Sequence, residues 1–452
     1  MNSLMISPSG VRGIVGKGLT PEVISELASA FGSLRPGKIL VGYDTRTSNQ
    51  MFKYAVFSGL LSVGCHAIDV GICPTPSLQL MVKDTDAKGG IVITGSHNPV
   101  EWNALKFIRD DGLFLYPEEG EELIRLYKRG NIPRAGWNKI GKVSFDDQAV
   151  AHHLQSILRV VNVNEIRNKK FKVVIDACNG AASVISPVLL EKLGCQVIRL
   201  NCKPDGIFPR PPEPVPENLE ELSKVVKEHQ ADIGFAHDAD ADRLVLVSEQ
   251  GEPLSEEYTL AIVTRFVLKE KTKGPVVTNI CTSQTVEDVV KEFGCQIIRT
   301  KVGDIHVSRK MKDCGAVIGG EGNGGVIFPS LNYARDGIVS IALILNYLAA
   351  ENRTISSICE ELPRYYMIKK KIESQGFNFE LLKEEVIKRF ESEDLDFLDG
   401  MKIKLPKGWV HIRPSGTEPV LRLISEAENS EIAGKNLKWA LELIERFKGE
   451  GK

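Results

Sequence analysis

The sequence has no hydrophobic run long enough to cross a bilayer. Its most apolar stretch, Val339 to Ala350, is interrupted by Asn346 and falls far short of the roughly 20 residues that a membrane-spanning helix needs. The first residues, Met1 to Gly13, lack the basic stretch followed by an apolar core that marks a secretion signal. We therefore expect a cytoplasmic protein with no membrane partner.

The sequence also lacks an excess of charge. Its 57 basic and 59 acidic residues give a net charge of −2, which provides no long-range field that attracts nucleic acid. An anionic ligand must therefore be held by local groups. The nine cysteines contain no C-x-x-C pair, and Cys65, Cys195 and Cys295 each follow a glycine just before an expected strand. We expect reduced, buried thiols rather than disulfides or metal ligands.

The chain is too long for one compact core. With 452 residues, and about 150 residues per domain, it is expected to form several domains. Three stretches repeat one order of elements, in which apolar strands alternate with helical patterns and the last strand ends in a polar loop. These stretches begin at KILVGYDTR, FKVVIDACNG and GPVVTNICT. The repeat predicts three α/β domains with mixed, mainly parallel sheets, whose strand ends form the ligand sites.

The remainder of the chain, from about Arg364, has a different pattern. Strands are expected at YYMIKKKIE, MKIKL and WVHIRP, with one helix through Phe390 and another near Leu437 to Phe447. This order predicts a C-terminal α+β domain. The expected division of the chain is 1–151, 152–254, 255–364 and 365–452, with the four domains arranged around one central cleft.

The first polar loop, Thr94–Pro99, places a serine directly after a buried strand. Ser96 stands between Gly95, which lets a ligand approach the backbone, and His97-Asn98, which can hydrogen-bond. One interpretation is an ordinary turn or a helix cap. The other is a hydroxyl that accepts and donates a phosphoryl group. The loop alone leaves both open.

The second loop carries Asp238, Asp240 and Asp242 at alternating positions. Three carboxylates so close together repel one another, and a hard divalent cation with oxygen ligands, such as Mg²⁺, would compensate their charge. A calcium EF-hand is disfavoured, because Arg243 occupies the position where that loop needs glycine, although Glu249 matches its twelfth position. A solvated acidic turn is the remaining alternative.

The third loop, Gly320–Gly325, is rich in glycine but lacks the lysine and serine of a phosphate-binding loop. Its Glu321 and Asn323 are acceptor and amide groups that suit sugar hydroxyls. A plain glycine turn is the alternative. The loop by itself is a weak signal.

The fourth loop, Arg413–Pro419, lies in the expected C-terminal domain. It combines the Arg413 guanidinium with the hydroxyls of Ser415 and Thr417 and the backbone N–H groups around Gly416. This combination predicts an anion pocket, and an N-capped turn is the alternative.

The four loops, in this order, resemble those of the α-D-phosphohexomutase superfamily across essentially the whole chain. That family has a TASHNP-like phosphoserine loop, a DGDGDR-like metal loop, a GExSG-like sugar loop and an RPSGTEP-like phosphate loop. Here Gly95 replaces the common alanine, Ala239 and Ala241 replace glycines, and Asn323 replaces a serine. The loop around Arg12 is also shorter than the family form.

The resemblance implies a role for each matched residue. Ser96 would be the phosphoserine, and it would also be a ligand of Mg²⁺ together with Asp238, Asp240 and Asp242. Catalytic roles fall on Ser96 and on residues around it, namely His97, Lys106, Arg12 and Arg243. Substrate binding falls on the third and fourth loops, namely Glu321, Asn323, Arg413, Ser415, Gly416 and Thr417.

The implied activity is interconversion of hexose 6-phosphate and hexose 1-phosphate through phosphoserine and a hexose bisphosphate. The phrase GGEGNGGVIFP resembles family members that act on glucosamine phosphate, with phosphomannomutase and phosphoglucomutase activity as the alternative. A non-catalytic sugar-phosphate sensor and a phosphatase with an aspartyl nucleophile are rivals from other classes, and Ser96 with Lys106 argues against both. The expected partner is a small phosphosugar; the oligomeric state is open, with a homodimer as the candidate.

Overall fold

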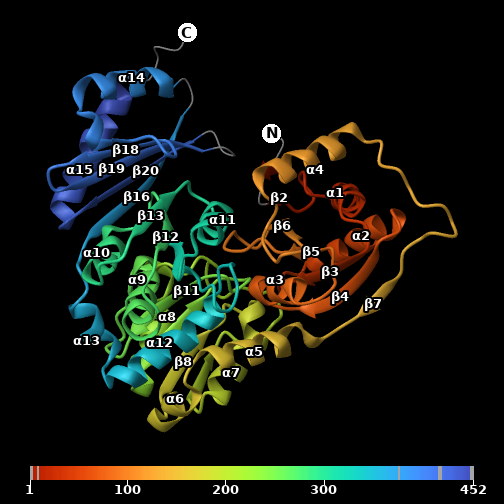
Figure 1. Cartoon of the computed structure of the whole chain (residues 1–452), viewed down its shortest axis with the longest axis horizontal. Coiled ribbons are helices and arrows are strands. Elements are labelled where there is room, and N and C mark those ends of the chain that lie inside the picture. The colour runs from red at the N-terminus through yellow and green to blue at the C-terminus, as the bar shows by residue number, and fades with distance from the viewer. Residues whose placement is uncertain (1–3, 8–9, 375–376, 416–419, 448–452) are drawn as a thin grey trace.

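The computed structural model describes residues 4–7, 10–374, 377–415 and 420–447, and in these the chain forms four β-sheets with their helices (Figure 1). We call the parts around the successive sheets domains I to IV. In Figure 1 domain I lies on the right and domain IV at the upper left, with domains II and III between and below them. This is the predicted architecture of three mixed-sheet α/β domains followed by an α+β domain.

Domain I is built on a seven-stranded sheet in the order β1-β2-β6-β5-β3-β4-β7. Its strands are β1 (Met5–Ser7), β2 (Gly10–Ile14), β3 (Lys38–Tyr43), β4 (His66–Ile72), β5 (Gly89–Ile93), β6 (Trp102–Arg109) and β7 (Val143–Phe145). The sheet has helices on both faces, with α1 and α2 on one and α3 on the other. The helices of this part are α1 (Pro21–Leu34), α2 (Asn49–Ser62), α3 (Thr75–Lys83), α4 (Pro117–Arg129) and α5 (Gln148–Val160).

Domains II and III each have a four-stranded sheet, in the orders β11-β10-β8-β9 and β13-β12-β14-β15. The strands of domain II are β8 (Lys172–Asp176), β9 (Gln196–Leu200), β10 (Ile233–His237) and β11 (Leu244–Ser248). Those of domain III are β12 (Val276–Asn279), β13 (Ile297–Thr300), β14 (Ile318–Glu321) and β15 (Gly325–Ile327). Strands β10 and β11 are buried along their whole length, although β11 is the last strand of its sheet, and for this reason they appear in the sequence as the apolar runs IGFAH and LVLVS.

The helices of domains II and III connect and cover these strands. Domain II has α6 (Val163–Lys169), η1 (Ala181–Val184), α7 (Ser186–Lys192), η2 (Pro216–Asn218) and α8 (Glu220–His229). Domain III has α9 (Glu256–Phe266), which continues into the π-helix η3 (Val267–Lys271), then α10 (Gln284–Glu292), α11 (Asp304–Cys314), α12 (Gly337–Glu351) and α13 (Ile355–Glu360).

Domain IV is an antiparallel sheet in the order β16-β20-β19-β18-β17 with two helices. Its elements are β16 (Tyr366–Glu373), α14 (Phe379–Arg389), η4 (Ser392–Asp394), β17 (Leu395–Asp396), β18 (Met401–Leu405), β19 (Gly408–Pro414), β20 (Val420–Ala427) and α15 (Ser430–Glu445). The last helix begins well before the predicted Leu437. Its start is set by Asn429, whose side chain accepts a hydrogen bond from the backbone N–H of Ile432.

The same local geometry produces the first three polar loops. In each of the first three sheets a central strand runs parallel to one neighbour, ends in the polar loop, and is followed at once by an antiparallel strand. The pairs are β5–β6, β10–β11 and β14–β15. The repeat therefore places three chemically different loops at equivalent ends of three sheets, where an open α/β sheet binds ligands.

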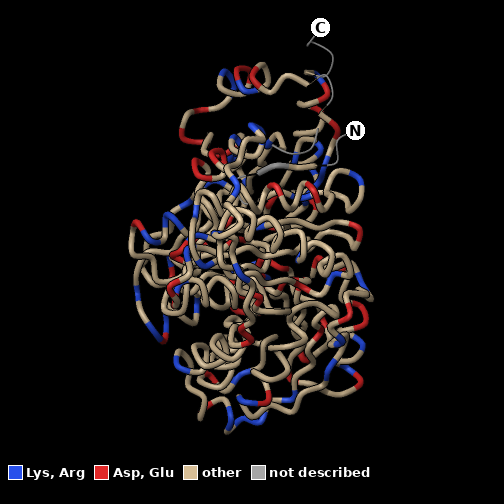
Figure 2. The backbone as a smooth tube through the Cα atoms, turned by 90° about the vertical axis from the view of Figure 1, so that its right-hand side faces the viewer, with Lys and Arg blue, Asp and Glu red and all other residues tan. Residues whose placement is uncertain are grey.

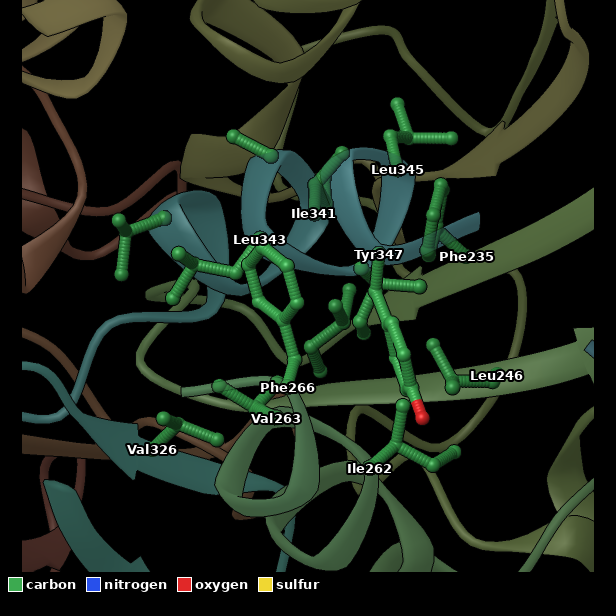
Figure 3. Packing of buried hydrophobic residues seen from close by; sticks show 14 of the residues in the cluster. Phe235, Leu246, Ile262, Val263, Phe266, Val326, Ile341, Leu343, Leu345 and Tyr347 are labelled. Atoms are coloured by element: carbon green, nitrogen blue, oxygen red, sulfur yellow. The ribbon is translucent and has the colours of Figure 1, made fainter. Parts of the chain in front are cut away.

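Domains II and III share one hydrophobic core. The helices α9 and α12 lie between the two sheets, and Figure 3 shows Ile262 and Phe266 of α9 packed with Ile341 and Tyr347 of α12 and with Phe235 of β10. The rings of Phe266 and Tyr347 stack with their centroids 5.3 Å apart. A helix that is apolar all round belongs in such an interior, which explains the apolar run of α12.

In the view of Figure 2 acidic and basic residues are both scattered along the tube, and neither sign gathers in one region. This agrees with the net charge of −2. Within the described residues no helix is both long enough and apolar enough to cross a membrane.

Candidate active site

The four predicted loops meet at one cavity of about 720 Å³. Every domain contributes to its wall. Among the residues that the sequence singled out, those in the wall are Arg12, Ser96, His97, Lys106, Arg243, Glu321, Asn323, Arg413 and Ser415. Gly416 and Thr417 lie outside the described residues.

Ser96 stands at the end of β5 with its hydroxyl directed to the aspartate loop. Its Oγ donates to Oδ2 of Asp238 at 3.0 Å and lies 3.4 Å from Nδ1 of His97. Its backbone has a φ of 49°, in the left-handed region that non-glycine residues seldom occupy. Such conformations persist where neighbouring groups hold them, and they are frequent at functional sites.

Arg46, at the end of β3, is the group that holds this loop. It is 2% exposed, and its guanidinium lies against Gly95, where an added Cβ would be only 2.7 Å from the guanidinium carbon. The contact explains why a glycine precedes Ser96 in this chain. Four backbone carbonyls accept hydrogen bonds from Arg46 at 2.7–3.0 Å, those of Ser96, Asn98, Pro99 and Trp102. The Asp44 carboxylate balances its charge at 3.2 Å.

The three aspartates lie beneath the cavity and are almost completely buried. One carboxylate oxygen from each of Asp238, Asp240 and Asp242 falls within 4.8 Å of the others. The Oδ1 atoms of Asp240 and Asp242 are buried and have no hydrogen-bond partner among the described residues. A buried carboxylate oxygen without a donor is costly, and a hard cation would satisfy both. The donor set therefore fits a divalent metal ion.

Cations already surround this loop. Lys106 on β6 donates to Oδ2 of Asp240 at 2.7 Å, and Arg335 donates to Oδ2 of Asp242 at 2.6 Å. Burial acts to raise the pKa of each carboxyl, but these cations hold the pKa of Asp240 and of Asp242 below its usual range. Asp238 differs, because burial and then the two neighbouring carboxylates raise its pKa well above the ordinary value.

Lys106 is a charged group in this arrangement. Burial alone would lower its pKa, but the carboxylates of Asp240 and Asp242 raise it above the ordinary lysine value. The ammonium therefore neutralises the aspartate loop.

His97 and Arg243 form a second polar pair next to Ser96. Nη2 of Arg243 lies 3.0 Å from Nδ1 of His97. Burial first, and then the Arg243 and Arg12 guanidiniums, hold the pKa of His97 well below its ordinary value. His97 is therefore a neutral ring between the serine and the arginine, and its Nδ1 can accept a hydrogen bond.

Glu321 is fixed by a network rather than left open to solvent. Its Oε1 accepts from Nδ2 of Asn279 at 2.8 Å and from the N–H of Gly303 at 2.9 Å, while its Oε2 accepts from Arg335 at 2.9 Å. Burial alone would raise the pKa of Glu321. The nearby Arg335 guanidinium outweighs burial and lowers this pKa, so the carboxylate stays charged. Asn323 uses its side-chain oxygen to accept from the N–H of Gly325 at 3.1 Å, within its own turn.

Arg413 belongs to the wall contributed by domain IV. Its Nη1 donates to Oδ2 of Asp399 at 2.8 Å, and the same oxygen accepts from the N–H of Val302 in domain III. Asp399 therefore orients the guanidinium while it joins the two domains. Ser415 follows Arg413 on the cavity wall.

Three residues that the sequence did not single out organise this site. Arg46 holds the serine loop, and Thr75 at the start of α3 donates to Oδ2 of Asp240 at 2.6 Å. Arg335 bridges Asp242 and Glu321, so it connects the second and third loops. The rule that strand ends carry site residues covers Arg46, in KILVGYDTR, but it does not cover Thr75, the first residue of α3, or Arg335, which lies in the loop before α12.

Comparison with known proteins identifies the family. The chain matches all four domains described for phosphoglucomutase/phosphomannomutase, with alpha/beta/alpha domains I, II and III at residues 5–132, 151–251 and 255–366, and the C-terminal domain at 370–440. The chain belongs to this family of phosphosugar mutases. The predicted superfamily, fold and class of enzyme are confirmed.

Individual relatives cover nearly the whole chain. A phosphoglucomutase/phosphomannomutase of Thermococcus kodakarensis is 41% identical over 444 residues, 96% of this chain and 97% of the relative. A probable phosphoglucosamine mutase of Methanopyrus kandleri is 40% identical over 433 residues, 94% of each. The structure also resembles the crystal structure of a phosphoglucomutase/phosphomannomutase family protein from Burkholderia thailandensis. The two superpose with a TM-score of 0.86 at 25% sequence identity, over 99% of each chain.

Proposed function

We propose that this mutase interconverts glucosamine 6-phosphate and glucosamine 1-phosphate, with Ser96 as the phosphoryl carrier. One observation carries the proposal. The Ser96 hydroxyl lies 3.0 Å from Asp238, in a buried cluster of three aspartates, at the wall of a cavity that all four domains line. A nucleophile placed against a metal-binding group in an enclosed cavity suits phosphoryl transfer, which depends on positioning and on charge neutralisation.

The reaction would consist of two transfers. In the first, the bond between phosphorus and Oγ of phosphorylated Ser96 breaks as a bond to a hydroxyl oxygen of the hexose monophosphate forms, which gives a hexose bisphosphate and free serine. The hydroxyl loses one proton and Ser96 gains one, and Lys106 is the proposed carrier of that proton. The bisphosphate turns over, and the second transfer reverses both exchanges at the other end of the sugar.

Mg²⁺ is the proposed metal ion, with Asp238, Asp240 and Asp242 as its protein ligands and Ser96 beside them. The proposal rests on the two buried Oδ1 atoms that no donor satisfies and on the preference of this ion for carboxylate oxygens. When bound, the ion would neutralise charge on the transferring phosphoryl group. Lys106 and Arg335 bind the Oδ2 atoms of Asp240 and Asp242, so the Oδ1 atom of each carboxylate is left for the ion.

The phosphate that is not reacting would be held in domain IV. Arg413 and Ser415 line the part of the cavity wall that domain IV contributes, and Asp399 orients the Arg413 guanidinium through Nη1. The predicted contribution of Gly416 and Thr417 belongs to the same proposal. With a phosphate clamp in domain IV and the phosphoryl carrier at Ser96, the bisphosphate can bind in two orientations. Either of its phosphates can then lie at the clamp while the other lies at the serine.

Glucosamine phosphate is the proposed sugar because the third loop has the pattern GGEGNGGVIFP, and a relative with 40% identity is named a probable phosphoglucosamine mutase. Glu321 of this loop lines the cavity as a charged carboxylate, which favours an ammonium-bearing sugar over a neutral one. The second candidate is a phosphomannomutase/phosphoglucomutase, since a relative with 41% identity carries that name. The two candidates share every step of the transfer and differ only at one substituent.

A comparison of three substrates tests the proposal. The values of kcat/KM for glucosamine, glucose and mannose 6-phosphates are measured at one Mg²⁺ concentration, with protein first primed by a hexose 1,6-bisphosphate. We expect the amino sugar to be preferred. If glucose or mannose phosphate were preferred by about tenfold or more, the phosphoglucosamine mutase proposal would be rejected in favour of a phosphomannomutase/phosphoglucomutase. Primed protein that converts none of the three would contradict the mutase itself and favour a sensor.

A further inference from the structure

Strand β7 forms the outer edge of the domain I sheet, and all three of its residues are exposed (Figure 1). It pairs in parallel with β4, where the carbonyl of Lys142 accepts from Ala67 and the N–H of Asp146 donates to Asp69, both at 2.9 Å. In a parallel pair this register turns the N–H and C=O groups of Val143 and Phe145 outward. No hydrogen bond to these groups occurs among the described residues.

Apolar side chains surround this free edge. Val143 and Phe145 pair with Ala67 and Asp69, so they lie on the face of the sheet that α2 covers, where Asp69 contacts Lys53 of α2. The loop before β7 is tied to the end of α2 by backbone hydrogen bonds from residues 135 and 141. We call five exposed apolar residues the edge patch: Tyr54 of α2, Trp137 and Ile140 of this loop, and Val143 and Phe145 of β7, which are 59, 89, 54, 47 and 67% exposed.

An unpaired strand edge is a template for a strand of another chain, and proteins protect such edges with charge, proline, a covering element or a very short strand. Strand β7 has only three residues, but it carries no charged residue and no proline, and its outer N–H and C=O groups have no hydrogen bond among the described residues. A patch of exposed aromatic residues also marks a surface for protein association.

The sequence of the edge is self-complementary. From Lys142 to Asp146 it reads cation, apolar, serine, apolar, anion. An antiparallel copy centred on Ser144 brings Lys142 opposite Asp146 of the second copy, and Val143 opposite Phe145 of the second copy. The outward N–H and C=O groups of Val143 and Phe145 then form hydrogen-bonded pairs, while Ser144 lies on the two-fold axis in a non-hydrogen-bonded pair.

We infer that β7 is the edge through which two copies of this chain pair, joining their domain I sheets into one continuous sheet about a two-fold axis. The occupant is a second copy rather than another protein, because the charge pattern and the free backbone groups complement their own two-fold image. The opposite edge of the sheet holds β1 and β2, and β2 carries Arg12 of the cavity wall. Pairing at β7 therefore leaves both cavities open.

Charge reversal tests the register. Sedimentation equilibrium of the wild-type chain should give twice the 49.9 kDa of one chain. Lys142→Glu and Asp146→Lys should each raise the dimer dissociation constant about tenfold or more, because a two-fold interface contains each charge pair twice. The double variant restores opposite charges and should return the constant to near the wild-type value. Turnover per subunit should stay unchanged in all three variants.

Asp146 also accepts a hydrogen bond from the N–H of Gln148 at the start of α5, so thermal melting of each variant checks that its fold is intact. Cross-linking provides a second test. Ser144→Cys, on the proposed axis, should form a disulfide-linked dimer on oxidation, whereas Val143→Cys, which is offset from it, should form far less. A wild-type chain that is monomeric at every concentration tested, or a dimer that tolerates both charge reversals, would overturn the inference.

Discussion

Ser96 illustrates how a single residue is prepared for chemistry by contacts that are remote in sequence. Its left-handed backbone is held by Arg46, which is 50 residues away, and its hydroxyl is directed to Asp238, which is 142 residues away. The serine therefore owes its position to domain I and its electrostatic surroundings to domain II. Changes at the serine and at the arginine should separate these two contributions.

Replacing Ser96 by alanine should abolish turnover and spare binding. The variant has no oxygen to carry the phosphoryl group, while the proposed phosphate clamp lies in domain IV, so kcat should fall by about a thousandfold or more. Stopped assays with each phosphosugar measure kcat, calorimetry measures binding, and intact mass shows whether one phosphate is lost. Ser183→Ala, which changes a buried serine of domain II outside the cavity wall, is the control. Retention of a tenth of normal activity would rule out Ser96 as the carrier.

Replacing Arg46 by lysine keeps the positive charge at position 46 but should distort the serine loop. A lysine cannot reach four carbonyls from one position, so the loop should lose its left-handed turn and kcat should fall by roughly tenfold to a hundredfold. The melting temperature should also fall, because buried carbonyls lose guanidinium donors, as does Asp44, which keeps its hydrogen bonds from Asn49, Thr94 and a backbone N–H. Arg109→Lys, which disturbs ion pairs with Asp111 and Glu119 outside the cavity wall, serves as the matched control. Equal effects of the two substitutions on kcat would contradict the proposed clamp.

At the scale of elements, the sequence predicts what depends on neighbours along the chain. The strands GGIVI and IGFAH are buried along their whole length, so the sequence predicts both the strands and the polar loops after them, which carry Ser96 and the aspartates. Contacts between distant segments were not readable. Arg335 lies 93 residues from the Asp242 that it holds, and no spacing rule relates them. Because α12 is apolar on all sides, its sequence likewise does not indicate which two sheets it packs between.

The start of α9 contacts β16 through a charge cluster that titrates near neutrality. Burial raises the pKa of Glu257 to about 7, although the Lys369 ammonium lies 3.0 Å from its Oε1 and opposes the shift. Glu256 on the same turn binds the same lysine, and against the effect of burial Lys369 lowers its pKa. An unfolded glutamate titrates near 4.5. Between pH 4.5 and 7 the folded protein therefore keeps a proton on Glu257 that the unfolded chain has released.

This shift predicts a stability that falls as pH rises through that window and is level above it. Glu257→Gln removes the titration, so its stability relative to wild type should rise between pH 4.5 and 7, by on the order of 2 to 3 kcal/mol. Melting temperatures of both proteins across pH 4.5 to 8 measure the difference. Glu256→Gln is the control and should show no such rise, because the pKa shift of Glu256 has the opposite sign. A constant difference between Glu257→Gln and wild type would contradict the raised pKa.

At the scale of the whole molecule, the domains are joined by buried polar contacts as well as by a shared core. His153 on α5 is fully buried, and its Nδ1 lies 2.8 Å from Oγ of Ser77 while its Nε2 lies 2.7 Å from Oδ2 of Asp336. Ser77 belongs to α3, whose first residue Thr75 binds Asp240. Asp336 caps α12 and follows Arg335, which binds Asp242. One histidine therefore ties together the two elements that hold the aspartate loop from opposite sides.

Replacing His153 by alanine should lower kcat while leaving KM for the phosphosugar nearly unchanged. The aspartate loop loses its common support, but the proposed phosphate clamp in domain IV does not depend on it. The melting temperature should also fall by several degrees, because the buried Oγ of Ser77 and the buried Oδ2 of Asp336 lose their hydrogen bonds to the histidine, at a cost of about 1 to 3 kcal/mol each. The neighbouring His152 is the matched control, since it binds Asp84 at the surface and its side chain is 35% exposed. His152→Ala should change neither kcat nor the melting temperature beyond the small effect of an exposed ion pair. If His153→Ala raised KM as much as it lowered kcat, or if both alanine variants behaved alike, His153 would support the fold in general and not the aspartate loop in particular.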